Sequence, residues 1–408
     1  MATQDVAPGA GVSFETGEQA RLILDSLDEF VEREVEPLES DLGETWSNPR
    51  LRHETDGRLV PEVVEAIEQI RKKSADAGFY AMNLPEAAGG DDVSNVTWYR
   101  AKKHVAGKGV GLAQYVLAGP EGPKPLLLQA EGEQVEKYLK PTVRGEKSTA
   151  FAQTEPGAGS DSPSMDARAE KEGDEWVING TKQWITNAPY ADFVQVFART
   201  TPAEEAGRYG GITCFLVERE EYEVGALNNA VGFEGMQAEV HLDDVRVGEN
   251  RVLGEPDAAF YNAMDFLSLG RLELGAEAIG HAEHLLDAAI DYAQDREAFG
   301  RPIGKFQGIS HKIARGRAKT YAADAAGLRC AWKLDAGETA IEDTSILKWF
   351  ATNAFWEVAD DTVQVHGGNG LAEDNPYMDG LHAARVLRIV EGADEIQLNT
   401  IAKQLGVT

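Results

Sequence analysis

The sequence predicts an α+β fold with an N-terminal α-helical domain, a central antiparallel β domain and a C-terminal domain resembling a four-helix bundle. Apolar residues recur at three- and four-residue spacing in the first and last thirds of the chain, as on buried helix faces. In the middle third the pattern changes to short runs that alternate or are rich in β-branched residues. At 408 residues, 42% of them apolar, the chain exceeds what one hydrophobic core usually serves. We therefore expect domains at residues 1–147, 148–254 and 255–408.

The N-terminal third is expected to be mostly helical. Leu24, Leu27, Val31 and Val35 share one helix face. Similar periods occur at residues 63–70 and 135–139, and Pro61 suits the first turn of the helix over 63–70.

The middle third contains strand-like runs at residues 193–197, 212–217 and 240–247. Asn179-Gly180, between two apolar stretches, predicts a tight hairpin turn because this dipeptide favours the left-handed conformation that such turns require.

The last third returns to a helical period, with two apolar stripes that predict long packed helices. One stripe consists of Leu272, Ala276, Ile279, Leu286, Ile290 and Ala293, and the other of Ile346, Phe350, Ala354, Val358 and Thr362.

The composition excludes several classes of partner. A net charge of −30 opposes binding to nucleic acid or to an anionic membrane surface. No apolar run approaches the ~18 residues of a membrane span, and residues 1–11 lack the pattern of a signal peptide. We expect a cytoplasmic protein with two ordinary buried cysteines, Cys214 and Cys330. Acidity spread this evenly is typical of surfaces that stay hydrated in concentrated salt, so we hypothesise a halophilic host.

One segment opposes this acidity, because residues 296–319 hold seven cations against the single acid Glu297. Two interpretations fit equally well. The cations bind the phosphates of a ligand, or they pair with acids elsewhere in the fold or in a neighbouring subunit.

Three segments are candidates for ligand binding. Residues 151–161 combine glycines with hydroxyls that can approach a planar or anionic ligand, although a surface turn explains them too. Trp184 could stack on a flat cofactor with Thr186 on the same strand face, or lie in the core. Residues 364–370 end a helix, where glycines commonly serve only as a C-cap. We assign no metal site, because His281 and His284 have no third ligand close in sequence.

Five motifs taken in order carry a resemblance. TEPGAGSD, WVINGTKQWITNA, REAFGRPIGKFQ, QVHGGNG and RIVEGADEIQ together resemble the FAD-dependent acyl-CoA dehydrogenase family over nearly the whole chain. The resemblance implies the acyl-CoA dehydrogenase fold and a homotetramer or homodimer. It also implies that FAD lies between the β domain and the C-terminal helices, with part of its site supplied by a neighbouring subunit.

The resemblance implies roles residue by residue. Glu391 matches the catalytic carboxylate; some relatives carry the base directly before the arginine matched by Arg271, where this chain has Gly270. Ser160, Arg271 and Gly392 would contact the substrate. The cofactor-binding residues would be Phe151, Gln153, Thr154, Ser160, Trp184, Thr186, Arg296, Phe299, Gln307, Gln364, Gly367, Gly368 and Glu395.

Three departures bear on these roles. Ala393 stands where many members have a threonine that contacts FAD, Glu395 where many have a glutamine, and Ala298 where some have a polar residue. The lost hydroxyl at Ala393 puts one flavin contact in doubt.

The implied activity is α,β-dehydrogenation of an acyl-CoA thioester. Glu391 would remove the α-proton while the β-hydride passes to flavin N5, and electrons would leave to an electron-transfer flavoprotein. Backbone N–H groups aimed at the thioester oxygen would stabilise the enolate. An oxidase-like relative, a decarboxylating relative and a non-dehydrogenating flavin-bearing binding protein remain alternatives.

Overall fold

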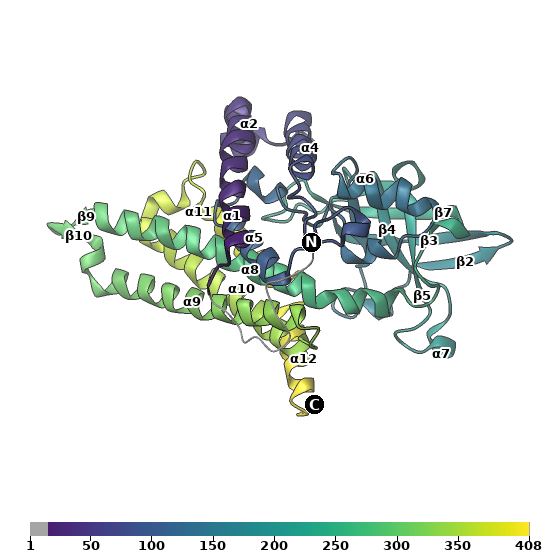
Figure 1. The fold of residues 1–408 in the computed structure, drawn as a ribbon. Helices are drawn as coiled ribbons and strands as arrows, with labels where there is room; N and C mark the ends of the chain where they lie inside the picture. The colour runs from purple at the N-terminus through teal and green to yellow at the C-terminus, as the bar shows by residue number, and fades with distance from the viewer. Residues whose placement is uncertain (1–14, 408) are drawn as a thin grey trace. The chain divides into compact units, whose positions relative to one another are not determined.

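The computed structural model describes residues 15–407, which fall into two compact units (Figure 1). The first unit takes residues up to 43, 92–114 and 267 onward, and the second takes 44–91 and 115–266. The expectation about residues 1–11 lies outside the described part of the chain. Within that part, no helix is long and apolar enough to cross a membrane.

The first unit is helical. Most of its residues lie in Glu18–Phe30 (α1), Glu36–Leu42 (α2), Asn95–Ala106 (α5), Ala259–Asp295 (α8, whose first turns belong to the second unit), Gln307–Asp335 (α9), Ile341–His366 (α10), Tyr377–Leu387 (α11) and Asp394–Gln404 (α12). A π-helical turn, Val31–Val35, joins α1 to α2, and the short strands Glu297–Ala298 (β9) and Arg301–Pro302 (β10) form a hairpin between α8 and α9.

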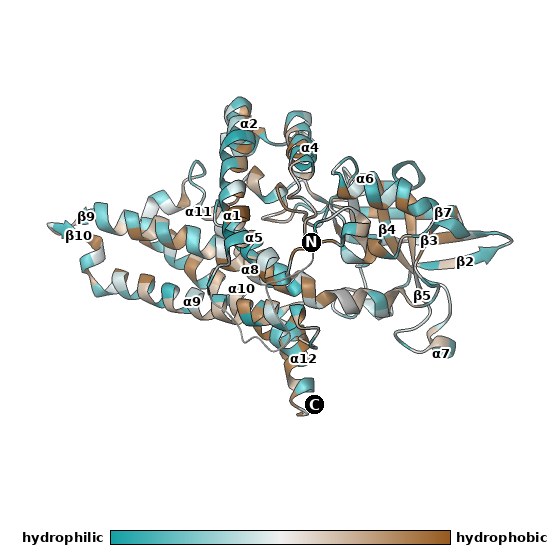
Figure 2. Ribbon diagram, in the orientation of Figure 1, coloured by the Kyte–Doolittle hydropathy of each residue, from teal (hydrophilic) through white to brown (hydrophobic). Residues whose placement is uncertain are grey.

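The core of the first unit lies where α8, α9 and α10 run side by side (Figure 1). The predicted α8 stripe is confirmed: Leu272, Ala276 and Ile279 are all buried in this core. The prediction that the second stripe is buried is confirmed at Ala354 and Val358. It is wrong at Ile346, which is 40% exposed. Polar and apolar residues interleave along these helices, as expected for helices with one buried face (Figure 2).

The second unit is built on an eight-stranded sheet. Its strands are Thr149–Ala152 (β1), Arg168–Glu172 (β2), Glu175–Thr186 (β3), Phe193–Arg199 (β4), Ile212–Glu218 (β5), Glu223–Leu227 (β6), Gln237–Gly248 (β7) and Val252–Leu253 (β8). Their order is β6-β7-β3-β2-β4-β5-β8, with β1 paired to β4. Most neighbours are antiparallel, and the pairs β1–β4 and β2–β4 are parallel.

Helices and turns complete the second unit. They are Glu44–Ser47 (α3), Pro61–Asp76 (α4), Lys140–Val143 (α6) and Ala203–Ala206 (α7), with a π-helical turn at Val135–Leu139. Short 3-10 helices in the two units lie at Pro49–Leu51, Glu86–Ala88, Leu112–Tyr115, Pro125–Gln129, Ser162–Ser164, Arg219–Glu221, Glu249–Arg251, Ile303–Lys305 and Gly367–Leu371. Pro61 opens α4 as predicted, and Cys214 and Cys330 are buried and unpaired.

The predicted hairpin turn at Asn179-Gly180 is wrong, because both residues lie within β3, at an irregularity in its pairing with β7. The chain turns earlier, at Gly173 between β2 and β3, where φ is +66°. Asn179 instead exchanges hydrogen bonds with Asp244 at 2.9 and 3.0 Å. A Cβ on Gly180 would lie 2.5 Å from that of Ala167, so a close packing contact explains this glycine.

Candidate active site

The predicted catalytic carboxylate, Glu391, lies in the short turn between α11 and α12. Its backbone is left-handed, with φ at +51°, and the next residue, Gly392, has φ at +95°. A left-handed glutamate is uncommon and costs free energy of about 1–3 kcal/mol. Such backbone persists only where its surroundings hold it in place, and it is concentrated at functional sites.

The glutamate side chain lies against α8 at Gly270. A Cβ built on Gly270 would come within 2.2 Å of Glu391 Oε2 and 3.1 Å of its Cδ. The absence of a side chain at Gly270 therefore makes room for the carboxylate. The structure thus brings together Glu391, Gly392 and Arg271, which the sequence had assigned to catalysis and substrate binding.

Buried cations surround this turn. Arg271 is buried and donates to Ser345 Oγ at 3.0 Å. Burial lowers the pKa of Arg271, and the nearby charge of Glu391 opposes that shift. Lys348 of α10 is fully buried and donates from Nζ to Gly392 O at 2.8 Å.

Sequence reasoning missed Lys348, although a signal was present. Ser345, Lys348 and Thr352 recur at helical spacing and are all fully buried, so α10 carries a polar strip inside its apolar pattern. Polar residues that repeat on a core-facing stripe indicate a buried polar site, because buried polar groups need hydrogen-bond partners.

In the second unit, two aromatic side chains lie exposed where a flat ligand was expected. Phe151 at the end of β1 is 37% exposed, and Trp184 near the end of β3 is 48% exposed. Trp184 also has a left-handed backbone, with φ at +62°, and its N–H donates to Asn228 Oδ1 at 2.9 Å. An exposed indole on a strained backbone is better explained by ligand stacking than by core packing.

The segment around Thr154 lies beside the segment around Trp184, because Gln183 N donates to Thr154 O at 2.9 Å. Thr186 Oγ1 accepts from Gln237 Nε2 at 3.0 Å, which leaves its hydroxyl proton available to a ligand. Gln153 Nε2 donates weakly to Ser162 Oγ at 3.3 Å. Across the described residues, the hydroxyls of Thr154 and Ser160 have no hydrogen-bond partner. This surface therefore offers aromatic faces and free hydroxyl donors, as an isoalloxazine ring requires.

A buried ion pair, which the sequence did not reveal, holds the residues of this surface in place. Lys182 and Glu155 are both buried, and Lys182 Nζ donates to Glu155 Oε1 at 2.7 Å and to Gln153 O at 3.2 Å. The carboxylate also accepts from the backbone N–H groups of Asp166 and Ala167 at 2.6 and 3.0 Å. The ion pair thus joins the 153–155 segment to β3, two residues before Trp184.

A third group of predicted residues gathers at one end of the first unit. Val365, near the end of α10, packs against Ala289 and Ala293 of α8. This contact brings Gln364, Gly367 and Gly368 close to the α8–α9 connection that carries Arg296, Phe299 and Gln307. Phe299 is 95% exposed with φ at +52°, a strained and solvated aromatic. About 38 Å of α8 separates Arg271 from Arg296 at the helical rise per residue, so this group is distinct from the Glu391 site.

The basic segment divides into two parts. Lys312 and Lys319 form ion pairs with Asp361 and Glu357, and Arg317 lies 3.5 Å from Glu283. In contrast, Arg296, Arg301 and Lys305 make no ion pair to any described residue. The ion-pair interpretation therefore holds for one half of the segment. Phosphate binding stays a prediction for the other half, which contains Phe299.

Two of the departures, Ala393 and Glu395, lie at the start of α12. Ala393 is the N-cap of α12 and supplies no side-chain hydrogen bond to the helix. Glu395 is exposed in the first turn. The structure does not bring Glu395 together with Arg296 or Phe299, since it lies in the turn that follows Glu391.

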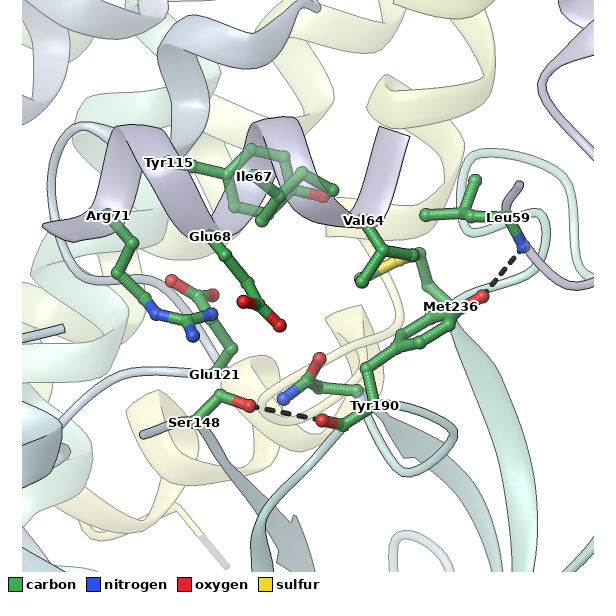
Figure 3. A pocket seen from close by; sticks show the side chains of 11 residues that line it. Leu59, Val64, Ile67, Glu68, Arg71, Tyr115, Glu121, Ser148, Tyr190 and Met236 are labelled. Atoms are coloured by element: carbon green, nitrogen blue, oxygen red, sulfur yellow. Dashed lines mark hydrogen bonds between the residues drawn. The ribbon is translucent and has the colours of Figure 1, made fainter. Parts of the chain in front are cut away.

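A small cavity lies in the second unit, apart from all the predicted residues (Figure 3). Its volume of about 20 Å³ fits a single water. Arg71 and Glu121 lie on one side, and Leu59 N donates to Tyr190 Oη at 2.7 Å on the other (Figure 3). The cavity is too small for a substrate. Among the described residues, no group of three or more His, Cys, Asp or Glu side chains could hold a metal ion.

The chain matches known proteins over most of its length. It matches the family models of the acyl-CoA dehydrogenase N-terminal domain at residues 17–146, middle domain at 150–245 and C-terminal domain at 259–406. It is 35% identical over 393 residues to a 3-(aryl)acrylate reductase of Clostridium sporogenes, covering 95% of this chain and 98% of that protein.

Two further relatives are similar over most of their length. The subunit CarC of the caffeyl-CoA reductase-Etf complex of Acetobacterium woodii is 34% identical over 85% of this chain and 92% of its own. The solved butyryl-CoA dehydrogenase of Megasphaera elsdenii superposes with a TM-score of 0.82 at 28% identity, covering 96% of this chain and 99% of that chain.

Proposed function

The chain belongs to the acyl-CoA dehydrogenase family, an FAD-dependent family of oxidoreductases, and from that premise we propose that Glu391 is its catalytic base. In this proposal Glu391 removes the α-proton of an acyl-CoA thioester. When bound, FAD supplies the acceptor for the β-hydride. The observation that carries the proposal is the placement of the Glu391 carboxylate over Gly270 by a strained left-handed turn.

The surroundings of Glu391 suit a base. Arg271 and Lys348 place positive charge beside the carboxylate, which favours its ionised, proton-accepting form. An acyl chain bound over the turn would exclude water and raise the proton affinity of the base. We assign Arg271, Gly392 and Ser160 to substrate contacts, and the backbone N–H of Glu391 to the thioester oxygen, where it would stabilise the enolate charge.

We propose that the FAD site has two parts from two subunits. Phe151, Gln153, Thr154, Ser160, Trp184 and Thr186 would hold the flavin ring in one protomer. A neighbouring protomer would supply the pyrophosphate and adenine contacts, namely Arg296, Phe299, Gln307, Gln364, Gly367 and Gly368. Glu395, in the first turn of α12, would be a separate FAD contact apart from this group. The proposed reaction requires the flavin beside the thioester at Glu391, and about 38 Å of α8 separates Arg271, next to Glu391, from Arg296, which supports this division. We therefore propose a homotetramer or homodimer.

The reduction of an enoyl thioester is a second candidate. Two relatives carry the names of reductases, one of an arylacrylate and one of caffeyl-CoA. The same residues serve both directions, since a protonated Glu391 would return the proton to the α-carbon. We propose an electron-transferring flavoprotein as redox partner, which the Etf complex of one relative supports.

We further propose that the protein works in the cytoplasm of a salt-adapted cell. The net charge of −30 supports this proposal, because a surface of hydrated carboxylates stays soluble when salt screens its self-repulsion.

Anaerobic mixing tests the proposed function. The purified FAD-loaded protein is mixed in high salt with acyl-CoAs of several chain classes, including 3-arylpropanoyl-CoA, while flavin absorbance is followed. The reduced protein is mixed in parallel with the matching enoyl-CoAs. We expect bleaching or reoxidation by one chain class, loss of that response in Glu391→Gln, and retention in Glu338→Gln, an exposed acid outside the site. A flavin that responds to no thioester in either direction would refute the function.

A further inference from the structure

Lys348 is an unusual lysine. It is fully buried in α10, and its Nζ donates to the carbonyl of Gly392 at 2.8 Å. Lysines are almost never fully buried unless paired with a carboxylate. No described carboxylate forms an ion pair with this ammonium group. Asp394, whose charge acts on Lys348, is bound by Arg388 Nε and Nη2 at 2.8 and 2.7 Å.

The carbonyl that Lys348 binds belongs to the strained turn. Glu391 and Gly392 are both left-handed, and two fully buried side chains converge on Gly392 O. Gln397 Nε2 is the second donor, at 2.9 Å, and it also lies 3.2 Å from Glu391 O. Two donors fill both lone pairs of the carbonyl and so fix the peptide that carries the base.

Four charged groups act on Lys348. Asp394 and Glu391 favour its charged form, while Arg271 of α8 and Arg388 oppose it. Burial is the larger effect and lowers the pKa of Lys348 to about 8. A lysine kept this far from water and bound to a neutral carbonyl has no ion pair that offsets its desolvation, so a role in the site explains its position.

We propose that Lys348 is a positioning residue for the base: its bond to the Gly392 carbonyl locks the Glu391–Gly392 turn so that the carboxylate stays over Gly270. The inference rests on the proposed function of Glu391. Lys348 touches neither substrate nor cofactor in this scheme, and it acts through the backbone. Its charged form makes the stronger hydrogen bond, so the lock weakens as pH rises through the pKa of the lysine.

The test compares Lys348→Met and Lys348→Arg with the matched control Lys333→Met. Lys333 lies in the last turn of α9 and pairs with Asp343 of α10. Steady-state kcat and KM, flavin content and melting temperature are measured for each from pH 6 to 10. For Lys348→Met we expect kcat to fall about 10- to 100-fold, because a small displacement of a catalytic group has that effect. KM, flavin content and melting temperature should stay close to wild type.

The pH profile separates positioning from simple packing. Wild-type kcat should decline above about pH 8, where Lys348 loses its proton. That decline should be absent in Lys348→Met, which is slow throughout, and shifted to higher pH in Lys348→Arg. Lys333→Met should match wild type at every pH.

Three outcomes would overturn the inference. They are a Lys348→Met enzyme with kcat within about twofold of wild type, a loss of kcat that only follows a loss of flavin or of folded protein, and a folded Lys348→Arg enzyme whose kcat follows the wild-type pH profile at every pH. The last result decides the matter even if Lys348→Met does not fold. Failure of the proposed function is distinguishable, because the wild-type enzyme would then show no thioester-dependent activity at any pH.

Discussion

The carboxylate of Glu391 fills the space that a side chain at Gly270 would need, since a Cβ there would lie 2.2 Å from Glu391 Oε2. Gly270 and Glu391, which are far apart in the sequence, therefore border the same space in the first unit. Two side chains cannot occupy that space together. The glycine before Arg271 thus leaves room for the proposed base.

Gly270→Ala should displace the carboxylate of Glu391 and lower kcat by about 100-fold, since the methyl group cannot share that space. Flavin content should be unchanged, because the change lies outside the residues proposed to hold FAD. Gly275→Ala on the same helix is not a fair control, since it clashes with Leu347. Gly308→Ala, where a Cβ meets nothing within 4 Å, is suitable. Full activity in Gly270→Ala would refute the placement.

Ala393→Thr should stabilise the start of α12. Ala393 is the N-cap and supplies no side-chain hydrogen bond, whereas threonine caps typically add about 1 kcal/mol to the free energy of unfolding. The added hydroxyl should also tighten FAD binding. Chemical denaturation and flavin titration measure the two effects, with Ala393→Val as the control that adds bulk without a cap. Equal behaviour of the two variants would argue against both effects.

The buried pair Lys182–Glu155 should behave as a coupled unit. Lys182→Met or Glu155→Gln alone leaves an uncompensated polar group and should cost about 3–5 kcal/mol of unfolding free energy. The double variant should cost less than the sum of the two. Because the pair joins the 153–155 segment to β3, each single variant should also bind FAD more weakly. Additive stability losses with unchanged FAD affinity would contradict this account.

Molar KCl should raise both activity and melting temperature. Sixty-nine acids against 39 bases repel one another in dilute buffer, and salt screens that repulsion. Initial rates and thermal melts from about 0.1 to 3 M KCl measure the effect. Activity that is highest in dilute buffer and falls steadily with salt would exclude adaptation to salt.

The sequence predicted the fold well where a single pattern decides the structure. The α8 stripe and Pro61 at the start of α4 were confirmed because helical period and proline geometry are local. Asn179-Gly180 misled because two unrelated contacts, with Asp244 and Ala167, required those residues in a continuous strand. Long-range packing had replaced the local turn preference.

The candidate site was predictable only through the ordered motifs. Nothing local distinguishes Glu391 among 69 acids; its left-handed backbone and its contact with Gly270 appear only in three dimensions. The pair Lys182–Glu155 was missed because sequence alone does not show which charged residues are buried. Lys348 was missed although Ser345, Lys348 and Thr352 recur at helical spacing, because only the structure shows that this strip is buried. The division of the basic segment also required structure, since Asp361 and Glu357 lie on another helix.

Exchange of the α-proton tests the central claim most directly. The FAD-loaded protein is incubated anaerobically in D2O with a thioester that reduces the flavin, and the recovered acyl-CoA is analysed for deuterium at the α-carbon. The account predicts rapid incorporation by wild type and by Glu338→Gln, and incorporation slower by at least about 1,000-fold in Glu391→Gln, which retains its flavin. Exchange at the wild-type rate in Glu391→Gln would show that another group is the base.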